Sequence, residues 1–387
     1  MKYPIIKPII DDKEIKSVIS VLKSGWITQG PKVEEFESRF ANLVGSKYAV
    51  AVSSCTAALH LSLKAIGVTK GDEVIVPSLS FIATANAIRY CGAIPNFVDI
   101  EINTFNLNPE LVETAINKKT KAILCVHQMG MPCDLERLLK ISNKYSIPII
   151  EDAACALGSR ISINNNWDYI GKPHGKIATF SFHPRKVITT GEGGMLTTND
   201  RVIFKKLKLL RQHGMSISDQ KRHQARKIIF EEYKTLGYNY RLTDIQAAIG
   251  VTQLVKLRGI ISRRRKIAKL YFKELSSISK VIVSTELSWQ KSNWQSFCVG
   301  IDLPKKSVHS IMDYLLKYSI STRRGIQCAH LEDTYKIEPW INRSKSNLDK
   351  SKRARDLFII LPLFDQMKHS DVNFICDKLK SAIDKFS

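Results

Sequence analysis

Short apolar runs recur along the first half of the chain, separated by stretches with helical spacing, and this alternation most restricts the possible fold. Each run has about the length of a strand that is buried on both faces, as a parallel sheet requires. The stretches 57–65 and 135–145 between them indicate crossover helices. The pattern predicts an α/β fold with a mostly parallel central sheet and helices on both faces. The candidate strands are residues 49–52, 74–76, 96–98, 123–126 and 147–150.

Helical segments with recognisable ends flank this region. Apolar residues recur at helical spacing between Asp11 and Gly25, and again from Val33 to Gly45. In both segments a glycine follows the last apolar residue, which is typical of a helix end. Thr243 is expected to cap a further long helix. The remaining expectations are helices near 307–317 and 371–384, a strand at 281–283, and a polar loop or hairpin tip at 164–166.

The length of 387 residues favours two domains over one core. The composition changes near residue 255, where a long basic helix leads into a strand and an irregular polar stretch. We therefore expect a large domain at residues 1–255 and a smaller C-terminal α+β domain at residues 256–387. Roughly the first 20 residues are expected to pack on the smaller domain.

The formal net charge of +23 is far from what solubility requires. Nucleic-acid binding, a polyanionic small substrate, or a lysine-rich composition without a function would each explain it. The densest basic run includes Arg263, Arg264 and Arg265, interleaved with apolar residues at helical spacing. That spacing favours the solvated face of an amphipathic helix. No helix-turn-helix or RNA-binding aromatic pattern accompanies this run. A basic regulatory or nucleic-acid-binding protein therefore stays only the second hypothesis for the function.

The cysteines and the apolar segments argue against disulfide-stabilised, metal-binding, secreted and membrane proteins. The eight cysteines contain no Cys-x-x-Cys pair, and we expect them to be reduced. Cys125, His127 and Cys133 are close in sequence, but their spacing matches no common metal site, so no metal is expected. No apolar run of about 18 residues and no signal-peptide pattern is present, so we expect a cytoplasmic protein without membrane insertion.

Two segments suit an anionic ligand. Residues 53–58 follow a candidate strand and open a helix with small side chains. A helix N-terminus offers free N–H groups and a positive dipole end to a phosphate, although the same residues also suit a simple helix cap. Asn239 and Arg241 precede the helix capped by Thr243. Taken alone, that second segment is typical of a plain helix start with a surface arginine.

A carboxylate and a lysine supply the candidate chemistry. Asp152 follows the candidate strand 147–150, where it could keep a pyridine nitrogen protonated, although a metal ligand or a helix cap would look the same. Lys186 ends the segment 179–186 and is followed by glycines at 191, 193 and 194. A lysine forms a Schiff base only when its amine is neutral, and a poorly hydrated site can lower its pKa. The glycine spacing does not match a dinucleotide-binding fingerprint.

In this order the segments resemble the DegT/DnrJ/EryC1/StrS family of sugar aminotransferases, which are fold-type-I pyridoxal-phosphate enzymes. Residues 24–31, 323–326 and 361–364 extend the resemblance over nearly the whole chain. It implies transfer of an amino group from glutamate to a nucleotide-linked keto-deoxysugar, for a cell-surface polysaccharide such as lipopolysaccharide or another glycoconjugate. Related dehydratases carry histidine at the position of Lys186. A different fold-type-I enzyme, such as a desulfurase or decarboxylase, is a further alternative.

The resemblance also implies residue roles. Lys186 would bind pyridoxal phosphate and move the proton, Asp152 would pair with the pyridine nitrogen, and Phe81 would stack on the ring. The other implied cofactor contacts are Thr56, Ala57, Gln128, Ser181 and Asn239, the last from the neighbouring subunit of a homodimer. The implied substrate contacts are Arg241, Arg323, His183 and His330.

One position departs from the family pattern. Cys155 stands where many relatives carry histidine, three residues after Asp152. A cysteine there could act as a nucleophile, but no general base accompanies it in the sequence. We therefore favour a packing role, as is usual for free cysteines.

Overall fold

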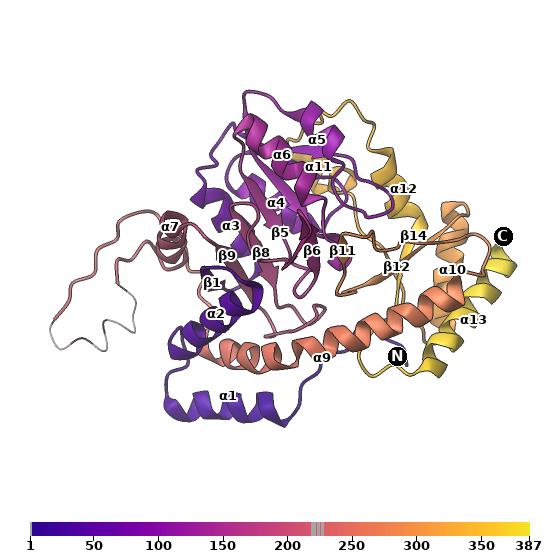
Figure 1. The fold of residues 1–387 in the computed structure, drawn as a ribbon, viewed down its shortest axis with the longest axis horizontal. Coiled ribbons are helices and arrows are strands. Elements are labelled where there is room, and N and C mark those ends of the chain that lie inside the picture. Colours follow the sequence, from indigo (N-terminus) through magenta and orange to yellow (C-terminus); the bar gives the residue numbers. More distant parts are fainter. Residues whose placement is uncertain (1, 218–221, 223–224, 226–227) are drawn as a thin grey trace.

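The computed structural model describes residues 2–217, 222, 225 and 228–387, and its centre is a seven-stranded sheet (Figure 1). The strand order is β1-β9-β8-β5-β4-β2-β3. The pairs from β8 to β3 are parallel, whereas β9 is antiparallel to both of its neighbours, so the predicted α/β class and mostly parallel sheet are confirmed. The strands are β1 (Tyr48–Val52), β2 (Glu73–Pro77), β3 (Ile94–Val98), β4 (Thr120–Val126), β5 (Ile149–Asp152), β8 (Ile177–Ser181) and β9 (Gly194–Thr198).

Polar residues explain where the strand prediction and the structure differ. Four candidate strands lie within β1 to β4, but β5 begins two residues later than predicted and includes Glu151 and Asp152. Neither β8 nor β9 was predicted, because buried threonines interrupt their apolar pattern. Those hydroxyls are bonded to backbone carbonyls: Thr179 Oγ1 donates to Glu151 O, and Thr197 Oγ1 donates to Gly171 O.

Helices pack on both faces of the sheet. Alternate residues of β1 belong to two different apolar clusters, one formed with α2 and α6 and the other with α3 and α7. Asp11 caps α1, and Gly25 ends that helix with a φ of 75°, as the sequence predicts. No described helix is long and apolar enough to cross a membrane. These helices are α1 (Asp12–Ser24), α2 (Pro31–Val44), α3 (Cys55–Ala65), α4 (Ile82–Tyr90), α5 (Pro109–Ala115), η1 (Gln128–Gly130), α6 (Leu135–Tyr145) and α7 (Arg201–Arg211).

A second apolar core surrounds a four-stranded antiparallel sheet in the order β10-β12-β14-β13. Tyr3 belongs to this core, whereas α1 packs along the helix that begins at Asp244. The expected boundary at residue 255 lies inside the continuous helix α9 (Asp244–Leu275), whose predicted cap Thr243 is confirmed. Tyr335 returns to the first sheet and packs beside Phe97. The division into two domains stays a prediction.

The remaining elements belong to this second half of the chain or to a small three-stranded sheet. That sheet has the order β11-β6-β7, and the expected hairpin tip is formed by Asn164 and Asn165, both with positive φ. The elements are β6 (Arg160–Ile163), β7 (Asn166–Tyr169), β10 (Val281–Val283), β11 (Gln290–Lys291), β12 (Phe297–Ile301), α10 (Lys305–Lys317), β13 (Arg323–Arg324), η2 (Ala329–Leu331), α11 (Thr334–Ile337), α12 (Asp349–Leu357), β14 (Phe358–Leu361) and α13 (His369–Phe386).

The three consecutive arginines of α9 all have partners within the chain. Arg263 pairs with Asp365, and Arg265 pairs with Glu286 at 2.6 Å. Arg264 is buried and donates to two backbone carbonyls of the segment before β12. The expected solvated face is therefore wrong for Arg264, whereas Arg263 and Arg265 are partly exposed and held in ion pairs. The three arginines that motivated the nucleic-acid alternative thus all have partners within the chain.

A buried ion pair joins α2 and α7 to the edge of the central sheet. Arg211 is 2% exposed and donates to the Glu37 carboxylate at 2.5 Å and to Ala51 O at 2.7 Å. The Ala51 N–H donates to the same carboxylate at 2.9 Å. Burial raises the pKa of Glu37, but the charges of Lys208 and Arg211 outweigh burial and hold it below its usual value. The carboxylate is therefore charged and fully partnered.

We predict that Glu37→Gln lowers the free energy of unfolding by about 3 kcal/mol, because it leaves a buried guanidinium without its charged partner. Glu35→Gln on the same helix removes two partly exposed ion pairs, with Lys32 and Arg39, and should lower this free energy by only about 0.5 kcal/mol. Urea unfolding followed by circular dichroism measures both changes. Equal decreases in the free energy of unfolding for the two variants would show that the buried ion pair stabilises the protein no more than the exposed pairs do.

Candidate active site

The residues predicted to act together follow the carboxyl ends of neighbouring strands. Asp152 ends β5, Lys186 follows β8, and Phe81 follows β2. Gln128 follows β4, and α3 begins directly after β1. Open α/β sheets bind their ligands at this edge.

The Asp152 carboxylate is buried and fixed in direction. It accepts a hydrogen bond from Thr84 Oγ1 at 2.9 Å and one from the Ala154 N–H at 3.1 Å. Burial raises the pKa of Asp152, and these hydrogen bonds together with the Lys186 charge only partly offset that rise. A carboxylate in this environment is stabilised by a positively charged partner, such as a protonated pyridine ring.

Lys186 lies close enough to Asp152 for the two groups to influence each other. Its amine donates to Cys155 Sγ at 3.1 Å, and Cys155 follows Asp152 by three residues. Burial lowers the pKa of Lys186, but the influence and the hydrogen bond of Cys155, followed by the influences of Cys55 and Asp152, outweigh burial, so the pKa lies above its ordinary value. The sequence suggested the opposite direction. The two thiols beside the amine account for the difference.

The start of α3 forms a narrow cradle suited to a phosphate. Ser54 caps the helix by accepting from the Ala57 N–H at 3.1 Å, so one of the two N–H groups predicted to hold phosphate already has a partner. A Cβ placed on Gly194 would lie 2.5 Å from the Ser54 carbonyl, so only glycine fits beside this turn. Gly194 also pairs with Ser181 across β8 and β9, which places Ser181 near the helix start. Thr56 lies in the first turn of the same helix.

The other predicted cofactor contacts have different surroundings. Phe81 is 56% exposed at the start of α4, so one face of its ring is available for stacking. Gln128 is buried, and its side-chain amide donates to Leu79 O at 2.5 Å, just before Phe81. Asn239 is exposed and pairs through its backbone with Gln212.

The predicted substrate contacts divide into two groups. His183 is half-buried in the loop of Lys186, and its pKa is lowered by burial and then by the charge of Arg185. Arg323 is exposed on β13, close enough for its charge to act on His183 as well, whereas Arg241 is half-buried before α9. His330 is instead buried against Ser78 and near the rings of Phe97 and Trp340, and burial lowers its pKa to about 4.

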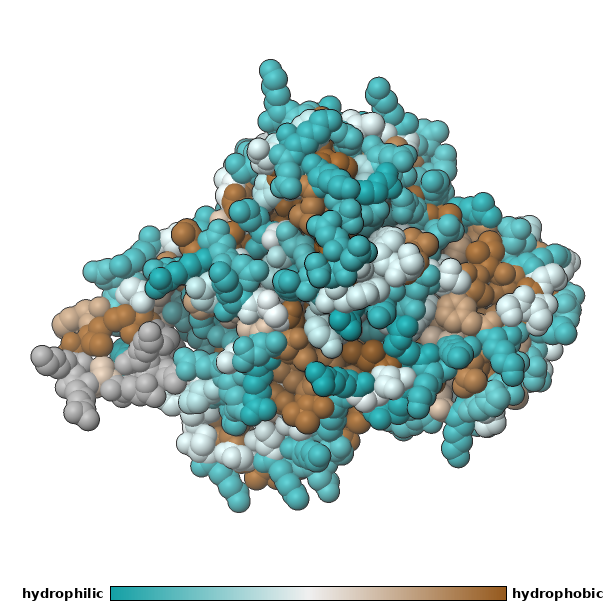
Figure 2. Space-filling model, viewed as in Figure 1, coloured by the Kyte–Doolittle hydropathy of each residue, from teal (hydrophilic) through white to brown (hydrophobic). Residues whose placement is uncertain are grey.

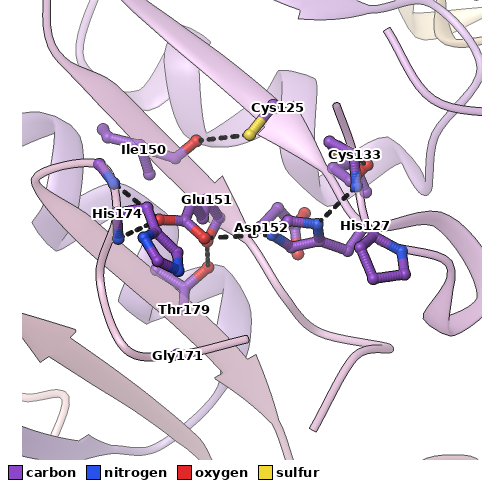
Figure 3. A network of polar contacts seen from close by, with 12 residues as sticks. Cys125, His127, Cys133, Ile150, Glu151, Asp152, Gly171, His174 and Thr179 are labelled. Atoms are coloured by element: carbon purple, nitrogen blue, oxygen red, sulfur yellow. Dashed lines mark hydrogen bonds and ion pairs between the residues drawn. The ribbon is translucent and has the colours of Figure 1, made fainter. Parts of the chain in front are cut away.

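A second buried carboxylate lies directly behind Asp152 (Figure 3). Glu151 contacts His127 Nε2 at 3.2 Å and accepts from the backbone N–H groups of His174 and Gly175 at 3.0 and 2.8 Å. The other ring nitrogen of His127 accepts from the Cys133 N–H at 3.0 Å.

The three residues whose sequence spacing argued against a metal site do come together. Potential ligand atoms of Cys125, His127 and Cys133 lie within 4.8 Å of one another. Both thiols donate to backbone carbonyls, that of Cys125 to Ile150 O and that of Cys133 to Val126 O. Both His127 nitrogens are also engaged, so a metal would have to displace this network.

Sequence reasoning missed several residues that complete the site. Thr84 reaches Asp152 from the first turn of α4, and Ser80 in turn contacts Thr84 at 2.8 Å. Asn293 is fully buried and donates to Cys155 O at 2.8 Å. No motif marks these positions in a single sequence. Thr84, three residues after Phe81, is the one whose place next to a predicted cofactor contact could have suggested a role.

The combination of a lysine amine, a buried carboxylate and a helix start with a tight glycine turn fits pyridoxal phosphate. Comparison with known proteins agrees with this chemistry. The model of the "DegT/DnrJ/EryC1/StrS aminotransferase family" matches residues 8–380. The uncharacterized protein MJ1066 of Methanocaldococcus jannaschii is 39% identical over 385 residues, which cover 98% of this chain and 97% of that protein.

Solved structures show the same similarity. Spr1654 of Streptococcus pneumoniae in its PMP form has a TM-score of 0.91 and 28% identity, with 99% of this chain and 100% of that chain covered. It is also known in a PLP form. PseC of Helicobacter pylori, an aminotransferase involved in the biosynthesis of pseudoaminic acid, has a TM-score of 0.89 and 28% identity, with 99% of each chain covered. The chain therefore belongs to the DegT/DnrJ/EryC1/StrS aminotransferase family of fold-type-I enzymes, and its cofactor is pyridoxal phosphate.

Proposed function

We propose that this enzyme moves an amino group from glutamate to the keto group of a nucleotide-linked deoxysugar, for the synthesis of a cell-surface polysaccharide or glycoconjugate. The observation that carries the proposal is the placement of Lys186, in the loop after β8, beside the buried Asp152 at the end of the neighbouring strand β5. The family membership and the similarity to PseC, an aminotransferase involved in the biosynthesis of pseudoaminic acid, support it.

The proposed chemistry divides the work between the cofactor and the chain. Pyridoxal phosphate supplies an aldehyde that condenses with amines and a ring that accepts electrons when its nitrogen is protonated. Lys186 would bind it covalently, and Asp152, oriented by Thr84 and Ala154, would keep the ring nitrogen protonated. Once displaced by the amino donor, the Lys186 amine would move the proton from the donor's α-carbon to the exocyclic carbon of the cofactor, and the same steps would run in reverse with the sugar.

The other roles follow from position. Phe81 would stack on the ring and Gln128 would approach its hydroxyl, while the start of α3 at Thr56 and Ala57, with Ser181, would hold the phosphate. His183 lies in the loop of Lys186 and within reach of the charge of Arg323, where the Arg323 guanidinium would attract the acceptor's diphosphate. Arg241 and His330 are further proposed contacts, although the buried setting of His330 favours packing.

We also propose a homodimer with shared active sites. After α7 the chain leaves the body of the protein as an arm, defined here by its described residues 215–217, 222, 225 and 228–238 (Figure 1). Apolar side chains on it are exposed, as the brown atoms at the left of Figure 2 show. A second copy would bury them and would bring Asn239, just beyond the arm, to the partner's phosphate. The exposed arm residues are Ile228, Phe230, Tyr233 and Leu236.

Lys186→Ala should reduce turnover by at least about a thousandfold, because the covalent anchor and the proton carrier are the same group. The absorbance band of the bound cofactor near the visible edge should disappear, and 2-oxoglutarate should no longer form from glutamate. Lys172→Ala is a suitable control, since Lys172 pairs with Asp168 on the surface. Normal turnover by the Lys186 variant would exclude the assignment.

A panel of sugars assayed for glutamate consumption tests the acceptor. Nucleotide-linked keto-deoxysugars should react, and the same keto sugar without the nucleotide should have a kcat/KM lower by about a hundredfold, because it lacks the binding energy of the diphosphate. Arg323→Gln should raise the KM of the nucleotide-linked acceptor only. Equal rates for the free and the linked sugar would refute the nucleotide requirement.

Mixing two impaired variants tests the shared site. Asn239→Ala should weaken cofactor binding by about tenfold, because a hydrogen bond to an anion is lost. When the Lys186→Ala and Asn239→Ala proteins are unfolded and refolded together, mixed dimers contain one site with both native residues, and activity should return. If Asn239 serves its own subunit, the mixture should be no more active than the Asn239→Ala protein alone.

A further inference from the structure

Cys155 contacts the reactive amine, although the sequence favours a packing role for it. Its Sγ accepts a hydrogen bond from Lys186 Nζ at 3.1 Å. Six of the eight cysteines are buried, whereas Cys155 and Cys55 are only partly so. The thiol of Cys55 is directed instead to Thr179 Oγ1, at 3.9 Å. Cys155 is therefore the thiol that lies at hydrogen-bonding distance from Lys186.

The backbone that carries this thiol is held from two sides. The turn after β5 is closed by the Ala154 N–H bond to the Asp152 carboxylate and by the Ala156 N–H bond to Ala153 O at 2.9 Å. From the segment before β12, Asn293 Nδ2 donates to Cys155 O at 2.8 Å and to Leu157 O at 2.9 Å. The thiol and the Asp152 carboxylate are thus presented by one short, fixed turn.

A lysine side chain is long and flexible, so a released amine loses its position unless another group holds it. We propose that Cys155 is the positioning residue that keeps the Lys186 amine beside the reacting carbon whenever that amine is not bonded to the cofactor. The proposal rests on the aminotransferase reaction described above. In this proposal the Cys155 thiol positions the amine that carries the proton, and it does not act as a nucleophile.

The titratable groups around the amine give this contact a measurable signature. Asp152 acts on it from β5, Cys55 from α3 and His183 from its own loop, and the charge of Arg185 in that loop acts on both His183 and Cys155. Burial lowers the pKa of Lys186, and Cys155 is the largest of the influences that raise it above its ordinary value. Replacing the thiol by an uncharged group should therefore lower the pKa of Lys186. Because only the neutral amine condenses with the cofactor, the pH midpoint of covalent cofactor attachment should also fall.

The experiment uses the full-length enzyme with bound cofactor and the variants Cys155→Ala and Cys155→Ser. Rapid mixing with glutamate follows the cofactor absorbance through one half-reaction. Cys155→Ala should convert about tenfold more slowly, with an unchanged half-saturating glutamate concentration, because a hydrogen bond to the amine is lost. Cys155→Ser keeps a hydrogen-bond acceptor and should remain within about threefold of the unmodified enzyme.

A pH titration of the absorbance without glutamate gives a second readout. Both variants lack the ionisable thiol, so both midpoints should move to lower pH, although only Cys155→Ala loses the rate. Cys91→Ala, at the end of α4, is the matched control and should change neither quantity.

Three outcomes decide the proposal. Wild-type rate and midpoint in Cys155→Ala would overturn it. The proposal would also be overturned if Cys155→Ser converted as slowly as Cys155→Ala and neither variant changed the pH midpoint, because the thiol would then only fill space. If glutamate converts no enzyme form while both midpoints still fall, the contact is supported and glutamate is removed as the donor.

Discussion

A buried carboxylate at the end of β5 is the constraint on which the proposed chemistry depends. Asp152 is 4% exposed, so its charged form is stable only where hydrogen bonds and a nearby cation replace water. Thr84 and the Ala154 N–H supply the hydrogen bonds, and Lys186 supplies a cation from the next strand of the sheet. A parallel sheet makes this meeting possible, since the ends of neighbouring strands share one edge.

The adjacent residue shows how the same strand end is kept rigid. Side chains alternate between the two faces of a strand, so Glu151 and Asp152 are directed oppositely. Glu151 is completely buried, yet it is bonded to His127 and to two backbone N–H groups. Burial raises the pKa of Glu151, but these partners outweigh burial and hold it below its usual value. The partners of Glu151 thus outweigh the effect of burial on its pKa, whereas those of Asp152 only partly offset it.

The sequence predicts the parts of this arrangement that depend on local pattern. Helix ends at Asp11, Gly25 and Thr243, and the strands β1 to β4, follow from caps and apolar runs. The family motifs point to Lys186 and Asp152 and to the cofactor. Strands β8 and β9 escape such reasoning because their buried threonines are satisfied only by long-range hydrogen bonds.

Contacts between distant segments account for the rest of what was missed. The contact of Cys155 with Lys186 joins the turn after β5 to the loop after β8, and no periodic pattern encodes it. Asn293 lies well over a hundred residues away along the chain and holds the turn after β5 through the backbone carbonyls of Cys155 and Leu157. The sequence shows that Cys155 lies three residues after Asp152, but only the structure shows that its thiol contacts the Lys186 amine.

The long helix α9 connects these local features into one unit. Its buried Arg264 donates to Trp294 O and Gln295 O, at 2.9 and 2.6 Å. Gln295 in turn donates to Arg185 O at 2.8 Å, next to the reactive lysine. With Asn293 bonded to Cys155 O, one short segment holds the backbones on both sides of the thiol–amine contact. The buried arginine of this basic run thus fixes the segment that supports the active-site loops, whereas its neighbours Arg263 and Arg265 form ion pairs with Asp365 and Glu286.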